Sequence, residues 1–170
     1  MWVHLLRHGI AIDPSDPACP TDPERFLTDK GKSRTRAAAK GLHRIDIAPV
    51  LIIASPYVRA QQTAEIAREE LGGDTIAFES SDALIPMADP SRIVDILRAK
   101  TESNIMCVGH APNLDLVVAY LLGADDPITS LKKAGCASIE IRHGRPGPGT
   151  GTLVGIYPAS ALRRLGGSDD

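Results

Sequence analysis

The chain has 170 residues, 43% of them hydrophobic, which suits one domain with a sizeable core. Its 19 basic and 21 acidic residues give a net charge of −2 without a stripe of Lys and Arg, so we expect no nucleic-acid partner. No apolar stretch is long enough for a signal peptide or a membrane span, and Cys19, Cys107 and Cys136 are too widely spaced for a disulfide framework or a metal-binding pair. We expect a cytoplasmic monomer that binds no membrane, with one domain over 1–165 and a disordered tail over 166–170.

Short apolar runs alternate with longer segments of helical period, a pattern typical of an α/β fold with a mostly parallel sheet. The expected strands, of which the third has the weakest signal, cover 2–6, 49–54, 75–78, 104–108, 137–141 and 153–157. The glycine- and proline-rich segment 144–151 joins the last two and favours a turn, so we expect an antiparallel hairpin at one end of the sheet. The other proline-rich segment, 13–23, predicts an ordered loop or lid near the first strand.

Four helices are expected between these strands. The first covers 29–44, and the second presents a face of small apolar residues over 60–71. Asp89 and Pro90 are typical of an N-cap and a first helical residue, so a third helix should begin there. The fourth has the clearest helical period, over 114–122, and a glycine follows it.

Polar clusters follow three of the expected strands, at the point where each strand ends. They are Arg7-His8-Gly9, Ser55-Pro56-Tyr57-Val58-Arg59 and Gly109-His110-Ala111-Pro112-Asn113. Because the carboxyl ends of parallel strands share one edge, where ligands bind in α/β sheets, the three clusters should form one pocket. That pocket would hold two arginines, two histidines and two helix N-termini, near Ser55 and Asn113, and this combination favours a phosphate.

The chemistry of such a pocket points to an imidazole nucleophile. No Cys, Ser or Asp stands beside the arginines as an evident nucleophile, and none of the four side chains is a carboxylate that could hold Mg²⁺. We therefore expect neither a metal nor a cofactor. Neighbouring positive charge should depress the pKa of His8 and keep a lone pair free for attack on phosphorus, from a ring nitrogen that the sequence leaves open. Arg7, Arg59 and a protonated His110 would hold the phosphoryl oxygens.

These clusters, extended to Leu6-Arg7-His8-Gly9 and Ser55-Pro56-Tyr57-Val58-Arg59-Ala60-Gln61-Gln62-Thr63, resemble the signature blocks of the histidine phosphatase (phosphoglycerate mutase-like) superfamily, in the family's order. The segment Arg25-Phe26-Leu27-Thr28-Asp29-Lys30-Gly31, with Phe26 in place of a proline, is similar to the short bacterial phosphohistidine phosphatases of the SixA type. The resemblance extends to about Pro158. It implies a three-layer α/β/α sandwich, a phosphohistidine intermediate at His8, and a phosphate pocket of Arg7, Arg59 and His110.

Two further residues are candidate substrate contacts. Arg25 belongs to the SixA-like segment, although an arginine in a loop is usually solvated. Asn113 is either a ligand contact or merely the N-cap of its helix. The remaining histidines, His4, His43 and His143, are expected to be ordinary residues of the fold.

The proton donor of related enzymes is missing from its usual place. Mutases and many ester phosphatases of the family place a Glu or Asp between the second and last blocks, whereas the region 80–89 offers only Asp82 as a weak candidate. The nitrogen leaving group of phosphohistidine is protonated readily near neutral pH, so we expect a phosphorylated protein as the partner, in signal transduction. The alternatives are a phosphatase or mutase of a small phosphorylated molecule and a non-catalytic phosphohistidine-binding module.

Overall fold

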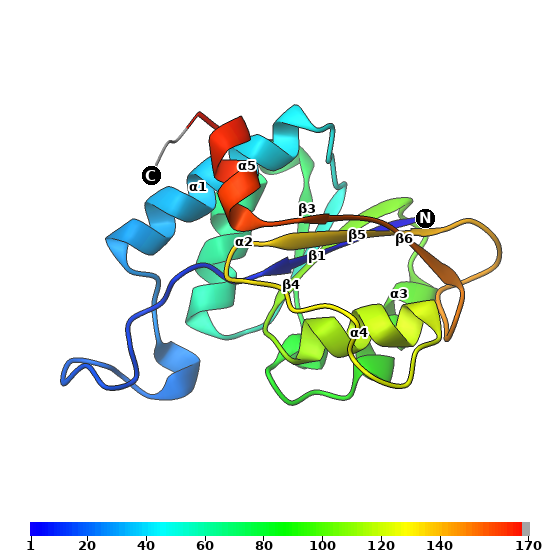
Figure 1. Cartoon of the computed structure of the whole chain (residues 1–170), viewed down its shortest axis with the longest axis horizontal. Helices are drawn as coiled ribbons and strands as arrows, with labels where there is room; N and C mark the ends of the chain where they lie inside the picture. Colours follow the sequence, from blue (N-terminus) through cyan, green and yellow to red (C-terminus); the bar gives the residue numbers. More distant parts are fainter. Residues whose placement is uncertain (168–170) are drawn as a thin grey trace.

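The computed structural model describes residues 1–167, which contain a single six-stranded sheet. Its strands are β1 (Trp2–Arg7), β2 (Leu51–Ala54), β3 (Ala77–Ser80), β4 (Asn104–Gly109), β5 (Cys136–Ile141) and β6 (Gly151–Tyr157). Across the sheet they are ordered β3-β2-β4-β1-β5-β6. Neighbours among β1 to β4 are parallel, whereas β5 is antiparallel to both β1 and β6. The predicted mostly parallel sheet with an antiparallel hairpin at one edge is therefore confirmed (Figure 1).

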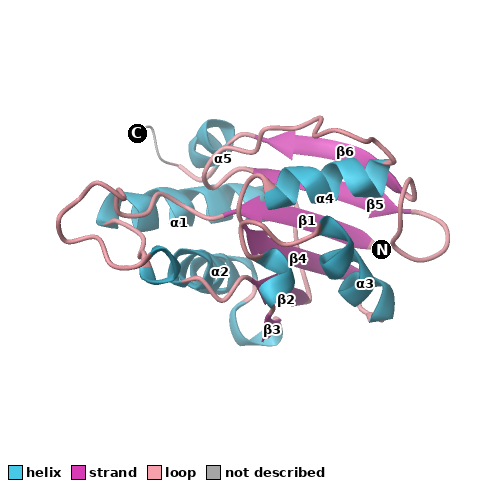
Figure 2. Ribbon diagram, turned by 90° about the horizontal axis from the view of Figure 1, so that it is seen from below, coloured by secondary structure: helices cyan, strands magenta, loops and turns pink. Residues whose placement is uncertain are grey.

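Within residues 1–167, five helices flank the sheet. They are α1 (Asp29–Arg44), α2 (Val58–Leu71), α3 (Pro90–Ala99), α4 (Asn113–Leu122) and α5 (Ala159–Leu165). The first, second and fifth share a core on one face, and α3 and α4 share the core on the other, as Figures 1 and 2 show. The predicted three-layer α/β/α sandwich is confirmed. None of the helices in the described part of the chain combines the length and the hydropathy that a membrane span requires.

Several elements differ from the prediction: β2 begins at Leu51 rather than at 49, and β6 begins at Gly151 rather than at 153. Strand β3 begins at Ala77 rather than at 75, because Gly73–Thr75 forms a 3-10 turn that the Ile76 N–H closes on the Gly73 carbonyl (3.2 Å). Helix α5 is absent from the prediction because it has only seven residues and buries two of them, too few for a periodic signal. The disordered tail predicted for 166–170 is only partly described: the Gly166 N–H ends α5 with a hydrogen bond, and 168–170 lie outside the described residues.

Alternating side chains of the central strands supply two separate cores. In β1, Val3 and Leu5 pack with α3 and α4, whereas Leu6 packs with α1, α2 and α5. Strands β2 and β4 alternate in the same way. Because both faces are covered, the central strands are apolar along most of their length, which explains why they stand out as apolar runs in the sequence. Burying each such Leu or Ile side chain contributes about 1.5–3 kcal/mol.

Helix α1 packs tightly against the segment that follows β1. A Cβ atom on Gly31 would lie 2.0 Å from the carbonyl oxygen of Ile10, and one on Gly9 would lie 2.2 Å from Oγ1 of Thr35. Only glycine permits approaches this close. The hydroxyl of Thr28 accepts a hydrogen bond from the Gly31 N–H (2.9 Å) and caps the helix. The N-terminal turn of α1 is therefore fixed directly beside the segment that carries His8.

Candidate active site

Backbone hydrogen bonds tie the carboxyl ends of β1, β2 and β4 together. The N–H of His8 donates to the carbonyl of Gly109 (3.0 Å), and the N–H of Ser55 donates to the carbonyl of Val108 (2.9 Å). Both bonds continue the parallel register of the sheet one residue beyond β1 and β2. The three polar clusters of the sequence are therefore held at one edge of the sheet, as predicted for parallel strands.

The four predicted pocket residues meet at this edge. The rings of His8 and His110 lie 5.0 Å apart, measured between centroids, with an angle of 56° between their planes. The positive charges of Arg7 and Arg59 are close enough to both rings to lower their pKa values. The arrangement brings two cations and two imidazoles to one site, while the catalytic role of each residue stays a prediction.

A hydrogen bond to the backbone fixes the tautomer of His8. The residue is 6% exposed, and its Nδ1 lies 2.7 Å from the carbonyl oxygen of Gly9. Because a carbonyl oxygen only accepts, Nδ1 carries the proton and Nε2 keeps a lone pair. Burial lowers the pKa of His8 to about 3, and the positive charges of Arg59 and Arg7 act in the same direction. The ring is neutral at physiological pH, as predicted, but burial is a larger cause than neighbouring charge.

Arg59 extends from the first turn of α2 and is 4% exposed. Its guanidinium carbon lies 5.1 Å from the centroid of the Tyr57 ring, a cation–π distance. One turn later, the hydroxyl of Thr63 donates to the carbonyl of Arg59 (2.7 Å) and accepts from the N–H of Gly9 (3.0 Å). This single hydroxyl therefore links the first turn of α2 to the residue that follows His8.

Arg7 is oriented from the opposite face of the sheet. Its Nη1 donates to the carbonyl of Leu131 (2.7 Å). The N–H of Leu131 and the hydroxyl of Thr129 both donate to Oδ1 of Asp115 in α4, at 2.9 and 2.6 Å. Burial lowers the pKa of Arg7, whereas the negative charge of Asp115 favours its charged form. A buried carboxylate thus holds the loop that positions this arginine.

His110 is buried beside Ser55 and Tyr57. It is 2% exposed, its Nε2 lies 3.0 Å from Oγ of Ser55, and its ring meets the edge of the Tyr57 ring. Burial lowers the pKa of His110 to about 3, and His8 and Arg59 act in the same direction. The ring is therefore neutral in the ligand-free chain, because burial and like charge both favour the neutral form. The protonated His110 that is expected to hold phosphoryl oxygens during transfer stays a prediction.

The two further candidate contacts have protein partners. Arg25 donates to the carbonyl of Ile12 through Nε (3.0 Å) and Nη2 (2.8 Å), in the loop before α1. Asn113 is fully buried, and its Nδ2 donates to the carbonyl of Ala88 (2.8 Å). The N-cap of α4 is Pro112, so the predicted N-cap role of Asn113 is wrong, because its side chain is engaged with the loop before α3 instead. A substrate contact by Arg25 or Asn113 stays a prediction.

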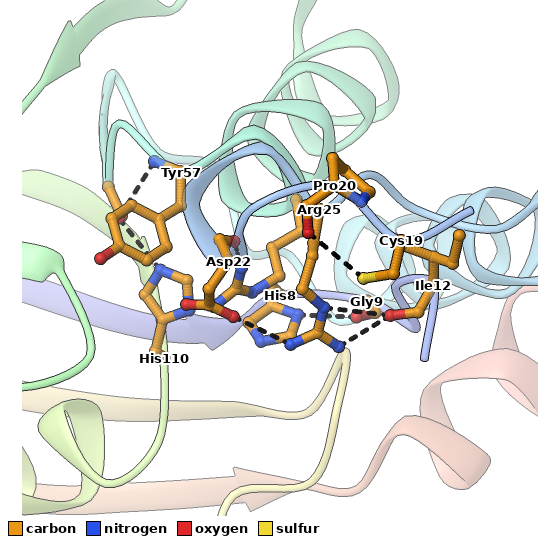
Figure 3. A network of polar contacts seen from close by, with 11 residues as sticks. His8, Gly9, Ile12, Cys19, Pro20, Asp22, Arg25, Tyr57 and His110 are labelled. Carbon is orange, nitrogen blue, oxygen red and sulfur yellow. Dashed lines mark hydrogen bonds and ion pairs between the residues drawn. The ribbon is translucent and has the colours of Figure 1, made fainter. Parts of the chain in front are cut away.

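A carboxylate that the sequence did not indicate lies against the pocket. Oδ2 of Asp22 lies 3.2 Å from Nη2 of Arg59, and Oδ1 lies 3.0 Å from Nη1 of Arg25. Figure 3 shows the Asp22 side chain beside the His110 ring, whose pKa its charge raises. Asp82, by contrast, is exposed in a 3-10 turn after β3, which β2 and β4 separate from β1. The three-residue spacing of Asp22 and Arg25 was a signal for their ion pair, whereas no spacing in the sequence points to the contact with Arg59.

Protonation of the buried histidines should destabilise the fold. Burial is the largest cause that lowers the pKa values of His4, His8 and His110 from 6.5 to about 4, 3 and 3. Because the unfolded chain binds these protons below its ordinary pKa and the folded chain does not, the free energy of unfolding should fall from about pH 7 to about pH 5. Urea unfolding at the two pH values measures the loss. A variant with both His8→Gln and His110→Gln should lose less, and an equal loss would contradict neutral rings.

Comparison with known proteins agrees with this arrangement. The family model of the histidine phosphatase superfamily (branch 1) matches residues 3–87. An uncharacterized protein of Picosynechococcus is 36% identical over 140 residues, which cover 79% of this chain and 82% of that protein. Phosphohistidine phosphatase SixA of Escherichia coli is 28% identical over 137 residues, which cover 75% and 78%. A solved structure of the protein histidine phosphatase SixA complexed with tungstate has a TM-score of 0.82 at 26% identity, covering 95% of this chain and 99% of that chain. The chain therefore belongs to the histidine phosphatase superfamily, in its SixA-type branch.

Proposed function

We propose that this protein is a phosphatase that acts through a covalent phosphohistidine on His8, without a metal ion. The observation that carries the proposal is the lone pair on Nε2 of a neutral, buried imidazole whose Nδ1–H is held by Gly9. Such a ring needs no general base before it attacks phosphorus. Arg7 and Arg59 supply the positive charge that a metal supplies in other phosphoryl-transfer enzymes. Within residues 1–167, no three His, Cys, Asp or Glu side chains are grouped so as to hold a metal ion.

The proposed reaction has two steps that use the same groups. In the first, Nε2 of His8 forms a bond to phosphorus, and the leaving group departs with the electron pair of the bond that breaks. In the second, water forms a bond to phosphorus, the bond to Nε2 breaks, and the ring recovers its lone pair while the proton of water passes to the released phosphate. The hydrogen bond from Nδ1–H to Gly9 stabilises the positive charge of the phosphorylated ring. Arg7 and Arg59 hold the phosphoryl oxygens in both steps.

Rapid quenching should trap the intermediate. Wild-type protein mixed with a ³²P-labelled phosphoramidate or phosphohistidine peptide should yield an acid-labile, base-stable phosphoenzyme, and turnover should persist in EDTA. His8→Ala should give no adduct and lose turnover by about a thousandfold or more. His143→Ala, which changes an exposed histidine after β5, is the matched control and should behave as wild type. An adduct that survives in His8→Ala, or one that resists acid, would contradict the mechanism.

The protonation of the pocket favours a nitrogen leaving group. Both histidines are neutral, and Asp22 is ionised, because hydrogen bonds from Arg25 and Arg59 lower its pKa although burial acts in the opposite direction. None of these three groups is thus a protonated acid at neutral pH in the ligand-free chain. An alkoxide leaving group needs such an acid, whereas the ring nitrogen of phosphohistidine is protonated readily by water. We therefore propose phosphohistidine in a protein as the substrate, which agrees with the activity in the name of the Escherichia coli relative.

This substrate class predicts strong discrimination by leaving group. The kcat/KM for a phosphohistidine peptide should exceed that for an unactivated alkyl phosphate by at least about a hundredfold, the usual contribution of a general acid. Steady-state phosphate release at pH 7.5 measures both rates. Asp82→Asn should change neither rate, since Asp82 follows β3, which β2 and β4 separate from the strand that carries Arg7 and leads to His8. Equal rates for the two substrates would contradict the claim that the pocket lacks a general acid. Loss of only the alkyl phosphate activity in Asp82→Asn would contradict it as well.

A basic groove beside the pocket favours a protein substrate over a small monophosphate. The groove has a volume of about 520 Å³ and runs from Arg7 past α1 to the start of α5. Its cationic lining residues include Arg34, Lys132 and Lys133, and none of the described residues that line it is acidic. The positive charge of Lys133, which lines the groove, is close enough to His8 to lower the pKa of that histidine. The groove therefore begins close to His8. Acidic side chains around a phosphohistidine would complement this surface.

Reversing charge in the groove should weaken binding of acidic peptides only. Arg34→Glu and Lys132→Glu should raise KM for a phosphohistidine peptide with acidic flanking residues by about tenfold, while kinetics with free phosphoramidate stay unchanged. Lys40→Glu, an exposed lysine of the same helix as Arg34 but outside the groove, is the control for net charge. Equal effects of all three variants, or an effect on phosphoramidate alone, would assign the groove no part in substrate choice.

A further inference from the structure

The carboxylate of Asp22 is bonded to the guanidinium of Arg59. Asp22 lies in the short 3-10 turn Asp22–Glu24, at the end of the proline-rich loop. Its carbonyl oxygen accepts from Nη1 of Arg59 (2.5 Å), and its Oδ2 accepts from Nη2 (3.2 Å). Both terminal nitrogens of this guanidinium are therefore bonded to one residue.

A phosphoryl group competes for the same donors. Arginine binds tetrahedral oxyanions through paired N–H groups of its planar fork, and the fork of Arg59 is already paired with Asp22. The remaining nitrogen, Nε, is buried and has no partner among the described residues. Arg59 is almost fully buried, so it has little room to offer a second set of donors elsewhere. A phosphoryl group that binds the fork through Nη2 therefore competes with the Asp22 carboxylate for this nitrogen.

The exchange of one anion for another is feasible on the Asp22 side. The Asp22 side chain is 53% exposed, in contrast to 5% for that of Arg59, so it can turn outward into water. Its second oxygen is held by Arg25, which is itself anchored to the Ile12 carbonyl and stays available as a partner when the Oδ2 contact with Arg59 is lost. An ion pair with one solvated partner is weak, so a dianion held by several donors can displace it.

We propose that Asp22 determines anion specificity by occupying the oxyanion site of Arg59 until a phosphoryl dianion displaces it. The inference rests on the proposed phosphoryl-binding role of Arg59 and adds that the Asp22 carboxylate competes with the phosphoryl group for this arginine. A monoanion such as a carboxylate gains little by replacing one carboxylate with another. A phosphoryl dianion gains a second charge facing Arg7, Arg59 and the two histidines, so it overcomes the competition. Asp22 therefore selects doubly charged ligands at the expense of affinity for all of them.

Removal of the carboxylate should strengthen binding of inorganic phosphate and reduce selectivity. In isothermal titration at pH 7.5, Asp22→Asn should bind phosphate about threefold to tenfold more tightly than wild type, the amount that a weak ion pair represents. The ratio of acetate affinity to phosphate affinity should rise at the same time. Glu24→Gln is the matched control, since it lies in the same 3-10 turn but its carboxylate accepts from the Thr21 hydroxyl (2.8 Å). Thermal melts of both variants confirm the fold.

Two outcomes would overturn the proposal. One is phosphate binding by Asp22→Asn that is unchanged or weaker than in wild type, which would assign Asp22 to holding Arg59 in place. The other is an equal gain in phosphate affinity in Glu24→Gln, which would show that the effect comes from the change in net charge and not from the contact of Asp22 with Arg59. Because the readout is binding, it is independent of turnover: a failure of the phosphohistidine mechanism appears in the quench experiment and leaves this titration intact. A fall in kcat for alkyl phosphates without tighter phosphate binding would instead identify Asp22 as a proton donor and contradict the competitor role.

Discussion

The pocket depends on concentrating positive charge where water is largely excluded. Arg59, His8 and His110 are each less than a tenth exposed, and they lie within electrostatic reach of one another. Like charges at this depth repel, so the structure keeps both imidazoles neutral and leaves the charge to the arginines. The backbone bonds of His8 to Gly109 and of Ser55 to Val108 hold this arrangement against the repulsion. The two cores, one on each face of the sheet, stabilise the fold and offset the unfavourable free energy of burying these charges.

Much of the fold could be predicted from the sequence because its signals are strong and local. The range 29–44 for α1 was right at both ends, since Thr28 provides an N-cap and the helix has four turns of periodic burial. The central strands were found because both their faces are buried, which makes them continuous apolar runs. Helix α5 and the start of β3 were missed because their limits depend on a few tertiary contacts and on one 3-10 turn.

For the site, sequence reasoning placed Arg7, His8, Arg59 and His110 together, because strand ends in a parallel sheet must converge. It did not find Asp22, whose contact with Arg59 depends on the path of a loop rather than on a strand. It did not address the charge of His110 in the ligand-free chain, since the depth of a side chain and the sum of its neighbours' charges are properties of the folded structure. The tautomer of His8 likewise became visible only through the position of the Gly9 carbonyl.

The close packing around Gly9 and Gly31 fixes the segment that carries His8, next to the base of the loop that follows it. Residues 8–10 are clamped between β4, α1 and the Thr63 hydroxyl, and the loop that follows is closed at its base by the Ile12 to Phe26 hydrogen bond and the Ala11–Leu27 bridge. The base of the loop is therefore fixed beside His8, whereas Asp22 within the loop is paired with Arg59. A change in 13–24 that spares Asp22 therefore alters the surface beside the pocket without altering the base that holds the segment of His8.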